Sequence, residues 1–208
     1  MLLVGFAVFV SAYMTGQGNG PYNVELELNE GWNIIAGTLP KDGISSNSEI
    51  QASDIRAMWY YSPTQKKYIL VYPKADLESL QKEDEDIYLT SAMWIYSNKA
   101  GIIKYSTLED YAPLENRQLY SGYNFVTITP DMDGKSLNDF KGNCEINKAY
   151  LWDVQNQQWG TILNLLDDKN ILQKEAGAGY GFIVKVLNDC SLSSAVNGGT
   201  ITPPSIPN

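Results

Sequence analysis

Alternation between apolar and polar side chains predicts the first β-strands of the chain. Val24 to Leu28 places acidic residues between apolar ones, the two-residue period of a strand with one solvent-facing side. Trp32 to Gly37 is a second apolar run, and the turn residues 29–31 separate it from the first. We therefore predict that these two strands form a hairpin.

Two further hairpins are predicted where aromatic strands flank a polar turn. The first joins residues 56–61 to residues 68–72, and the second joins Ala149 to Val154 with Trp159 to Leu163. Tyr and Trp favour pleated, half-buried surfaces, so these aromatic runs are typical of strands rather than helices.

The second half of the chain repeats the first. Gly31-Trp32-Asn33 and Gly122-Tyr123-Asn124 lie 91 residues apart (122 − 31), and the match continues through both aromatic hairpins. The further matches are Trp59-Tyr60-Tyr61 with Tyr150-Leu151-Trp152, Tyr68 with Trp159, and, at an offset of 88, Ser91 to Tyr96 with Gly179 to Val184. Self-similarity sustained over this length predicts a duplicated structural unit.

We predict a mainly β fold of two tandem, related β-rich modules, each a small antiparallel sandwich or barrel-like sheet. The first module covers residues 23–110 and the second residues 111–193. An apolar N-terminal arm and Gly-rich linker precede them (residues 1–22), and a Pro/Gly-rich tail follows (residues 194–208). Short helices are expected at Asp76 to Asp86, Ser136 to Phe140 and Asp167 to Glu175.

Residues 1–14 are mostly apolar and uncharged, but a bilayer span takes about 20 residues. Leu2 to Phe9 is typical of the apolar part of a secretion signal, and Val10-Ser11-Ala12 resembles a cleavage site, although the basic front end is missing. Alternatively, Met1 is a mature N-terminus, as in pilin-like subunits. The segment then lies between subunits as a helix or donated strand, or packs on the protein's own core. The side chains predicted to drive assembly are Leu2, Leu3, Val4, Phe6, Val8, Phe9 and Val10.

Charge and composition exclude several function classes. The net charge is −9, so the clustered cations that bind a phosphate backbone are missing and nucleic acid is not an expected partner. The chain has no His, which removes the commonest proton-transfer side chain near neutral pH and the commonest zinc ligand. We therefore expect a protein that is not an enzyme and has no cofactor. A carboxylate-only glycosidase mechanism survives this argument, but no pair of acids suggests one.

Cys144 and Cys190 lie in the second module, each beside a predicted strand. In a secreted protein an even pair of cysteines predicts a disulfide; two buried free thiols are the alternative. Ser53 and Ile102 stand at the matching positions of the first module, so the bridge is expected to be structural rather than essential to the fold.

Asp131, Asp133 and Asn138 are the best metal candidates. An Asp-x-Asp-Gly turn supplies hard oxygen ligands, which suits calcium. Lys135 stands at the fifth position of the loop and no Glu at the twelfth, so it departs from an EF-hand. A solvated turn before an N-capped helix explains the same residues, and we prefer that interpretation.

Aromatic rings that recur in both modules suggest a platform on which sugar rings stack. The candidates are Trp32, Trp59, Tyr60, Trp94, Tyr123, Trp152 and Trp159. The alternative is that they pack between strands as core and cross-strand pairs, and their repetition favours this, because a repeated fold repeats its core. The polar turn residues 155–158 (Gln155, Asn156, Gln157 and Gln158) are then the expected contact sites.

The order of a GWN strand, an aromatic hairpin, a short acidic helix and a Gly/aromatic strand (residues 91–95 and 179–183) resembles repeated β-modules of prokaryotic, often archaeal, cell-surface proteins. The resemblance covers residues 24–193 and implies a role in surface layers, adhesins or filaments, with no catalytic residues. We expect an extracellular structural or adhesive surface protein that assembles with itself through its N-terminal arm, as a pilus-like filament or a surface layer. The alternative is a non-catalytic carbohydrate-binding module of a secreted protein, with surface glycans as partners.

Overall fold

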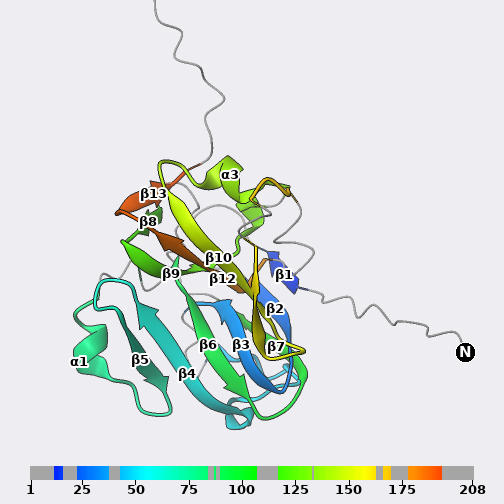
Figure 1. Ribbon diagram of the computed structural model, residues 1–208. Helices are drawn as coiled ribbons and strands as arrows, with labels where there is room; N and C mark the ends of the chain where they lie inside the picture. Colours follow the sequence, from blue (N-terminus) through cyan, green and yellow to red (C-terminus); the bar gives the residue numbers. More distant parts are fainter. Residues whose placement is uncertain are drawn as a thin grey trace, which may run out of the picture.

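The computed structural model describes residues 12–15, 23–37, 43–83, 87, 90–106, 117–132, 134–162, 166–169 and 178–193. The described part is mainly β, as predicted (Figure 1). Its strands are β1 (Ala12–Thr15), β2 (Asn23–Leu28), β3 (Gly31–Ala36), β4 (Ile55–Ser62), β5 (Lys67–Tyr72), β6 (Ala92–Ser97), β7 (Gly101–Ser106), β8 (Arg117–Leu119), β9 (Gly122–Thr127), β10 (Ile146–Asp153), β11 (Gln158–Thr161), β12 (Gly181–Val186) and β13 (Cys190–Leu192).

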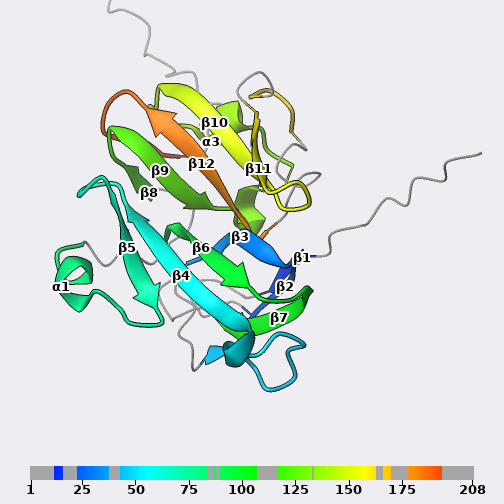
Figure 2. The same ribbon diagram turned by 60° about the horizontal axis from the view of Figure 1, so that its bottom comes forward.

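Both modules have the same antiparallel topology. The first module contains a four-stranded sheet in the order β3-β6-β4-β5, and the second contains one in the equivalent order β9-β12-β10-β11. Each module adds a two-stranded ribbon, β2 with β7 and β8 with β13, and β1 widens the first ribbon to three strands. Figure 2 shows the two four-stranded sheets one above the other. Equal strand order in both halves confirms two related β-rich modules.

Strand pairing fixes which residues are equivalent and corrects one predicted register. Trp59 pairs with Trp94, and Tyr150, 91 residues after Trp59, pairs with Ile183. Trp94 is therefore equivalent to Ile183, an offset of 89, and the predicted offset of 88 is wrong by one residue. That prediction matched Trp94 to Phe182, ring to ring. In the structure Phe182 and its true equivalent, Met93, both face the main core. A one-residue slip moves a side chain to the opposite face of a sheet. Matching the aromatic ring of Trp94 to that of Phe182 therefore equated residues that lie on opposite faces.

The predicted hairpin between the first two strands is wrong, because β2 and β3 lie in different sheets. The buried side chain of Asn33 holds the turn between them: its amide donates to the Asn29 carbonyl (2.9 Å), and its oxygen accepts from the Asn29 N–H (3.0 Å). Asn124 makes the equivalent pair of bonds with Tyr120, at 2.7 and 2.9 Å. One buried asparagine per module thus replaces ladder bonds and redirects the chain from ribbon to sheet.

The two modules are related by a pseudo-twofold rotation. Ile35 forms a β-bridge with Tyr180, and Val126, the equivalent of Ile35, forms one with Ser91, the equivalent of Tyr180. Such reciprocal contacts are the signature of a twofold interface. Near the axis the sheets approach closely: a Cβ added to Gly181 would lie 2.3 Å from the Cβ of Ala92, its own equivalent. Only a residue without a side chain fits there.

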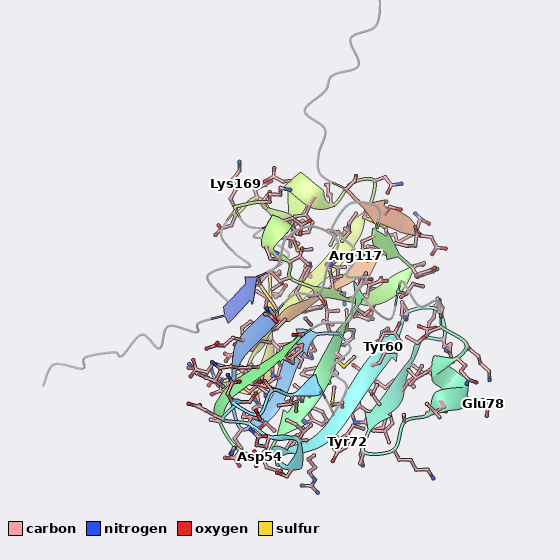
Figure 3. The ribbon with its side chains drawn as sticks, turned by 180° about the vertical axis from the view of Figure 1, so that it is seen from behind. Asp54, Tyr60, Tyr72, Glu78, Arg117 and Lys169 are labelled. Atoms are coloured by element: carbon pink, nitrogen blue, oxygen red, sulfur yellow. A yellow bond between two sulfur atoms is a disulfide. The ribbon has the colours of Figure 1, made fainter. Side chains whose placement is uncertain are left out.

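One hydrophobic core serves both modules. Its main cluster includes Leu26, Met58 and Met93 from the first module and Leu151 and Phe182 from the second, all 6% exposed or less. Each four-stranded sheet turns one face to this core and its other face to the other sheet. Figure 3 shows Tyr60 on β4, in the first module, and Arg117 in the second module; both are buried. The modules are topological repeats that share one interior.

The described helices are short. α1 (Leu77–Leu80) begins at Asp76, whose side chain accepts from the Ser79 N–H, and it covers only the first part of the predicted helix. α3 (Leu137–Phe140) begins with a capping box of Ser136 and Asp139 and confirms the helical turn predicted there. Two 3₁₀ turns are η2 (Ala52–Asp54) and η3 (Pro130–Met132). No described helix is long and apolar enough to cross a membrane.

Candidate functional site

All five tryptophans of the chain line one cavity between the two modules, together with Tyr68. The cavity has a volume of about 380 Å³. It is open to solvent, as the exposure of two lining residues shows: Tyr68 is 49% exposed and Trp159 40%. We call it the tryptophan cavity. Its lining residues are Trp32, Trp59, Tyr68, Trp94, Trp152 and Trp159.

Strand alternation brings these rings to the faces that the two sheets turn toward each other. Trp94 on β6 lies opposite Trp59 on the neighbouring strand β4, so the two rings share one face. Trp152 on β10 and Trp159 on β11 are paired in the same way in the second module. The cavity is therefore built by cross-strand aromatic pairs from both modules.

Edge-to-face packing fixes the rings. Trp94 lies at the centre: its centroid is 4.8 Å from that of Trp152 and 5.3 Å from that of Trp159, at interplanar angles of 89° and 68°. Trp32 also packs edge-on against Trp94, with a centroid distance of 5.8 Å and an interplanar angle of 72°. Aromatic pairs prefer this geometry, and each pair contributes about 0.5–1.5 kcal/mol beyond the burial of area. The apolar surface is thus formed before any ligand arrives.

Three hydrogen bonds clamp the second module onto strand β3. The Trp32 N–H donates to Oε1 of Gln157 (2.8 Å), and the Trp32 carbonyl accepts from Nε2 of Gln157 (3.1 Å) and from the Trp152 indole N–H (2.8 Å). Gln157 has a positive φ of 51° in the β10–β11 turn, as Lys66 has (53°) at the equivalent position of the first module. This inter-module clamp holds one wall of the cavity against the other.

A second cavity of about 450 Å³ adjoins the first and shares Tyr68 and Trp159 with it. We call it the tyrosine cavity, and the two together the aromatic groove. Its lining residues are Tyr61, Tyr68, Tyr123, Phe125, Tyr150, Trp159 and Ile183.

The groove is uncharged. No described residue that lines either cavity is acidic or basic. Burial raises the pKa of Tyr61, and the neighbouring phenols of Tyr68 and Tyr123 raise it further, so this hydroxyl stays neutral at physiological pH. A cation lies beside the groove: the Nζ of Lys185 is 5.5 Å from the centroid of the Tyr123 ring. A lining of neutral rings suits binding through shape and apolar contact.

The predicted aromatic residues divide between groove and core. Six of the seven candidates line the groove, Tyr123 in the tyrosine cavity and the five tryptophans in the other. Tyr60 is fully buried and donates its hydroxyl to Glu83 (2.6 Å). Tyr60 is core, as the preferred interpretation predicts. Trp59 with Trp94 and Trp152 with Trp159 form the cross-strand pairs that it also predicts, but these rings keep part of their surface exposed at the groove.

Strand alternation was the signal that could have found the missed lining residues. Tyr61 follows Trp59 by two positions and therefore shares its face. Tyr150 and Phe125 are placed on the groove side by the same alternation in the second module.

Two of the four turn residues expected to bind a partner use their side-chain amides within the protein. Gln157 binds Trp32, as described, and Asn156 donates from its side-chain amide to Asp153 (2.7 Å). Gln155 and Gln158 are exposed. The turn therefore positions the groove more than it offers free amides.

Two of the three calcium candidates are hydrogen-bonded to other side chains. Asp131 accepts a hydrogen bond from the Thr129 hydroxyl, and Asn138 donates to Asp167 (2.6 Å). Asp133 lies outside the described residues, and no group of three His, Cys, Asp or Glu side chains suited to a metal occurs among the residues that are described. Calcium binding therefore stays a prediction.

The predicted disulfide is present, since Cys144 and Cys190 are bonded at an S–S distance of 2.11 Å. It ties β13 to the segment before β10. Cys190 pairs with Leu119 as Gly101 pairs with Leu28, so Gly101, not Ile102, is the matching position in the first module.

The seven side chains predicted to drive assembly (residues 2–10) lie outside the described residues. Residues 12–15, which the sequence analysis placed in the arm, form β1 and pair with β2. Comparison of the chain with protein-family models, with curated proteins and with solved structures gave no match.

Proposed function

We propose that this protein is an extracellular, non-catalytic adhesin that binds carbohydrate in the aromatic groove. The single observation that carries the proposal is the gathering of all five tryptophans around one open cavity. Large indole rings are normally buried in a core, and a contiguous exposed apolar surface costs solubility unless it has a partner. Trp and Tyr are also the residues that contribute most to binding interfaces.

Carbohydrate fits this lining better than other ligands. A pyranose ring presents apolar C–H groups on its faces, which pack on indole and phenol rings, while its hydroxyls remain in water or bond to groups at the rim. The net charge of −9 and the uncharged groove disfavour nucleic acid, which also stacks on aromatic rings but needs cations along its backbone. The disulfide supports an oxidising, extracellular location. The resemblance to prokaryotic surface modules is in keeping with this proposal.

A glycan array followed by tryptophan-fluorescence titration tests the proposal. Saturable binding to one sugar class, with a change in tryptophan emission, is expected. Trp159→Ala removes an exposed lining ring and should weaken binding about tenfold or more. Leu77→Ala is the matched control, because it removes an exposed apolar side chain on α1, which does not line the groove.

Two results would overturn the proposal. One is the absence of saturable binding to any glycan. The other is binding of a proline-rich peptide in the groove, since polyproline helices also dock between aromatic rings.

Self-assembly through the N-terminal arm is a second proposal, favoured by the position of β1. This strand pairs with β2 and forms the edge of its three-stranded sheet, and strands of other chains can be recruited at such an edge. Deletion of residues 1–11 keeps β1 and should abolish assembly while leaving a folded monomer, as measured by light scattering and electron microscopy. Normal assembly of this truncated chain would contradict it.

A further inference from the structure

The tyrosine cavity is the pseudo-symmetric copy of the tryptophan cavity. The strand equivalences convert the lining of the first into that of the second: Trp32 becomes Tyr123, Trp59 becomes Tyr150, Trp94 becomes Ile183, Trp152 becomes Tyr61, and Tyr68 and Trp159 exchange places. Only Phe125 is added. Two cavities found at equivalent positions are the two halves of one duplicated groove.

Tyr68 and Trp159 lie where the halves meet. They are equivalent residues, each belongs to both cavities, and they are the most exposed rings of the lining. Trp159 contacts Trp94 in one half and Tyr150 in the other, at centroid distances of 5.3 and 6.2 Å. A ligand that reaches from one cavity to the other therefore passes these two rings.

We propose that the ligand is a linear chain of neutral β-1,4-linked pyranoses of the gluco configuration, which occupies both cavities at once as adjoining subsites. This inference rests on the proposed carbohydrate function and adds the class of carbohydrate. Rings from both modules line each cavity, so a bound sugar ring meets aromatic surface on both of its faces. Pyranoses of the gluco configuration have equatorial hydroxyls and axial C–H groups, so both of their faces are apolar. An equatorial β-1,4 linkage keeps the chain extended and leaves both faces of each ring free, as two adjoining aromatic cavities require.

The two subsites differ in chemistry, which gives the bound chain a direction. The tryptophan half offers indole faces and no free hydroxyl except that of Tyr68. The tyrosine half replaces three indoles by phenols, at Tyr61, Tyr123 and Tyr150, which add hydrogen-bonding groups. The two ends of a sugar chain therefore meet different surfaces, and one orientation is favoured.

The experiment is a length series titrated against the full chain by calorimetry. The probes are β-1,4-linked glucose and N-acetylglucosamine oligomers of increasing length, from two to six rings. Affinity should rise by about a hundredfold once an oligomer is long enough to enter both subsites, and then level off. Equal affinity of short and long oligomers overturns the two-subsite inference and leaves the proposed function intact.

Two variants at equivalent positions complete the test. Trp59→Ala empties part of the tryptophan cavity and Tyr150→Ala part of the tyrosine cavity. Each variant should reduce affinity for the long oligomer to about that of the short one. The short oligomer fills a single subsite, so it should be weakened only by the variant whose ring lines that subsite. Unchanged long-chain binding by Tyr150→Ala contradicts the second subsite. If the array detects glycans but neither β-1,4 series binds, the sugar class named here is wrong; if no glycan binds at all, the proposed function itself fails.

Discussion

At the residue scale, the G-x-N sequence that opens each sheet owes its form to two requirements. Gly31 and Gly122 have φ values of 100° and 113°, which side-chain-bearing residues rarely adopt. Two residues later a buried asparagine bonds back to the turn, through both its amide and its oxygen. The motif is thus a device for leaving the ribbon and entering the sheet, and the variable middle residue, Trp32 or Tyr123, is free to face the groove.

Replacement of either asparagine should destabilise the protein. Asn33→Ala leaves the half-buried Asn29 backbone groups without their partner and should lower the free energy of unfolding by about 2 kcal/mol, and Asn124→Ala by a similar amount. Urea denaturation measures both. Asn98→Ala, at an exposed bend, is the control and should cost less than about 0.5 kcal/mol. A loss that small at Asn33 would refute the role of the side chain.

The two glycines separate backbone strain from inter-module contact. A Cβ at Gly122 would meet nothing within 4 Å, so Gly122→Ala should cost only the strain of its positive φ, about 1 kcal/mol. A Cβ at Gly31 would lie 2.7 Å from Oε1 of Gln157, so Gly31→Ala should also displace the clamp and cost more. Equal costs would contradict this account.

A double-mutant cycle isolates the clamp. Gln157→Ala removes the atoms that a Cβ at residue 31 would strike, so its cost should be smaller in the Gly31→Ala protein than in the wild type, by about 1 kcal/mol. The same cycle with Gly122→Ala should show no coupling, because that position has no contact with Gln157. Both cycles are measured by urea denaturation.

At the element scale, one carboxylate holds the β4–β5 hairpin and the end of the α1 segment together. Glu83 accepts hydrogen bonds from Tyr60 on β4 (2.6 Å), from Thr64 and from Gln65 (3.2 Å) in the turn. Burial alone raises the pKa of Glu83, but the hydrogen bonds from Thr64, Tyr60, Ser62 and Gln65 outweigh burial and lower the pKa below its usual 4.5.

The lowered pKa predicts a loss of stability in acid. A group whose pKa falls on folding stabilises the fold fully above its unfolded pKa and loses this contribution as the pH falls through the folded value. Wild-type stability should therefore decline as the pH falls below about 4.5, and Glu83→Gln should reduce that decline. Urea unfolding of both proteins between pH 7 and pH 3 measures how steeply the free energy of unfolding declines. Glu78→Gln, an exposed carboxylate on α1, should keep the wild-type pH dependence.

The disulfide should stabilise the second module through its unfolded state. It closes a loop of 46 residues, so replacing both cysteines by serine should lower the free energy of unfolding by up to about 4 kcal/mol. Thermal and urea unfolding of the oxidised wild type and the double variant measure this. The fold itself should survive, because the first module forms the same sheet without a bridge; an unfolded double variant would disprove that.

At the scale of the whole molecule, the shared core should make the two modules one cooperative unit. Ile35, fully buried in the main cluster, belongs to the first module, and it is bridged to Tyr180 in the second. Local strand pairing alone would leave two small sheets, each marginal in isolation. Their common interior supplies the burial that neither has alone.

Cooperativity predicts that damage to one module destabilises both. Ile35→Ala should cost about 2–4 kcal/mol and retain a single unfolding transition. Hydrogen exchange of the backbone amides in β9 and β12, in the other module, should accelerate to the same extent as exchange in β6. Two separate transitions, or unchanged protection in the second module, would show that the modules unfold independently.

The sequence carries local information about this fold and little about its long-range geometry. The 91-residue offset correctly identified Trp59 and Tyr150, and Tyr68 and Trp159, as equivalent residues. It succeeds there because the β4–β5 and β10–β11 hairpins have the same turn length in both modules. It could not show that β2 and β3 part, since a single side chain, Asn33, decides this. It also could not show which face of a sheet meets the other module. Alternation separates Met93 from Trp94, but only the packing of two sheets makes one face core and the other groove.

The reciprocal bridges around the pseudo-twofold axis have an evolutionary consequence. A surface that pairs with its own copy needs no second protein, so a lone ancestral module carrying it would have formed symmetric dimers with two identical recesses. Fusion into one polypeptide would have freed each copy to change separately. The divergence of Trp94 from Ile183, and the cysteine pair confined to one copy, are the outcome expected after such a fusion.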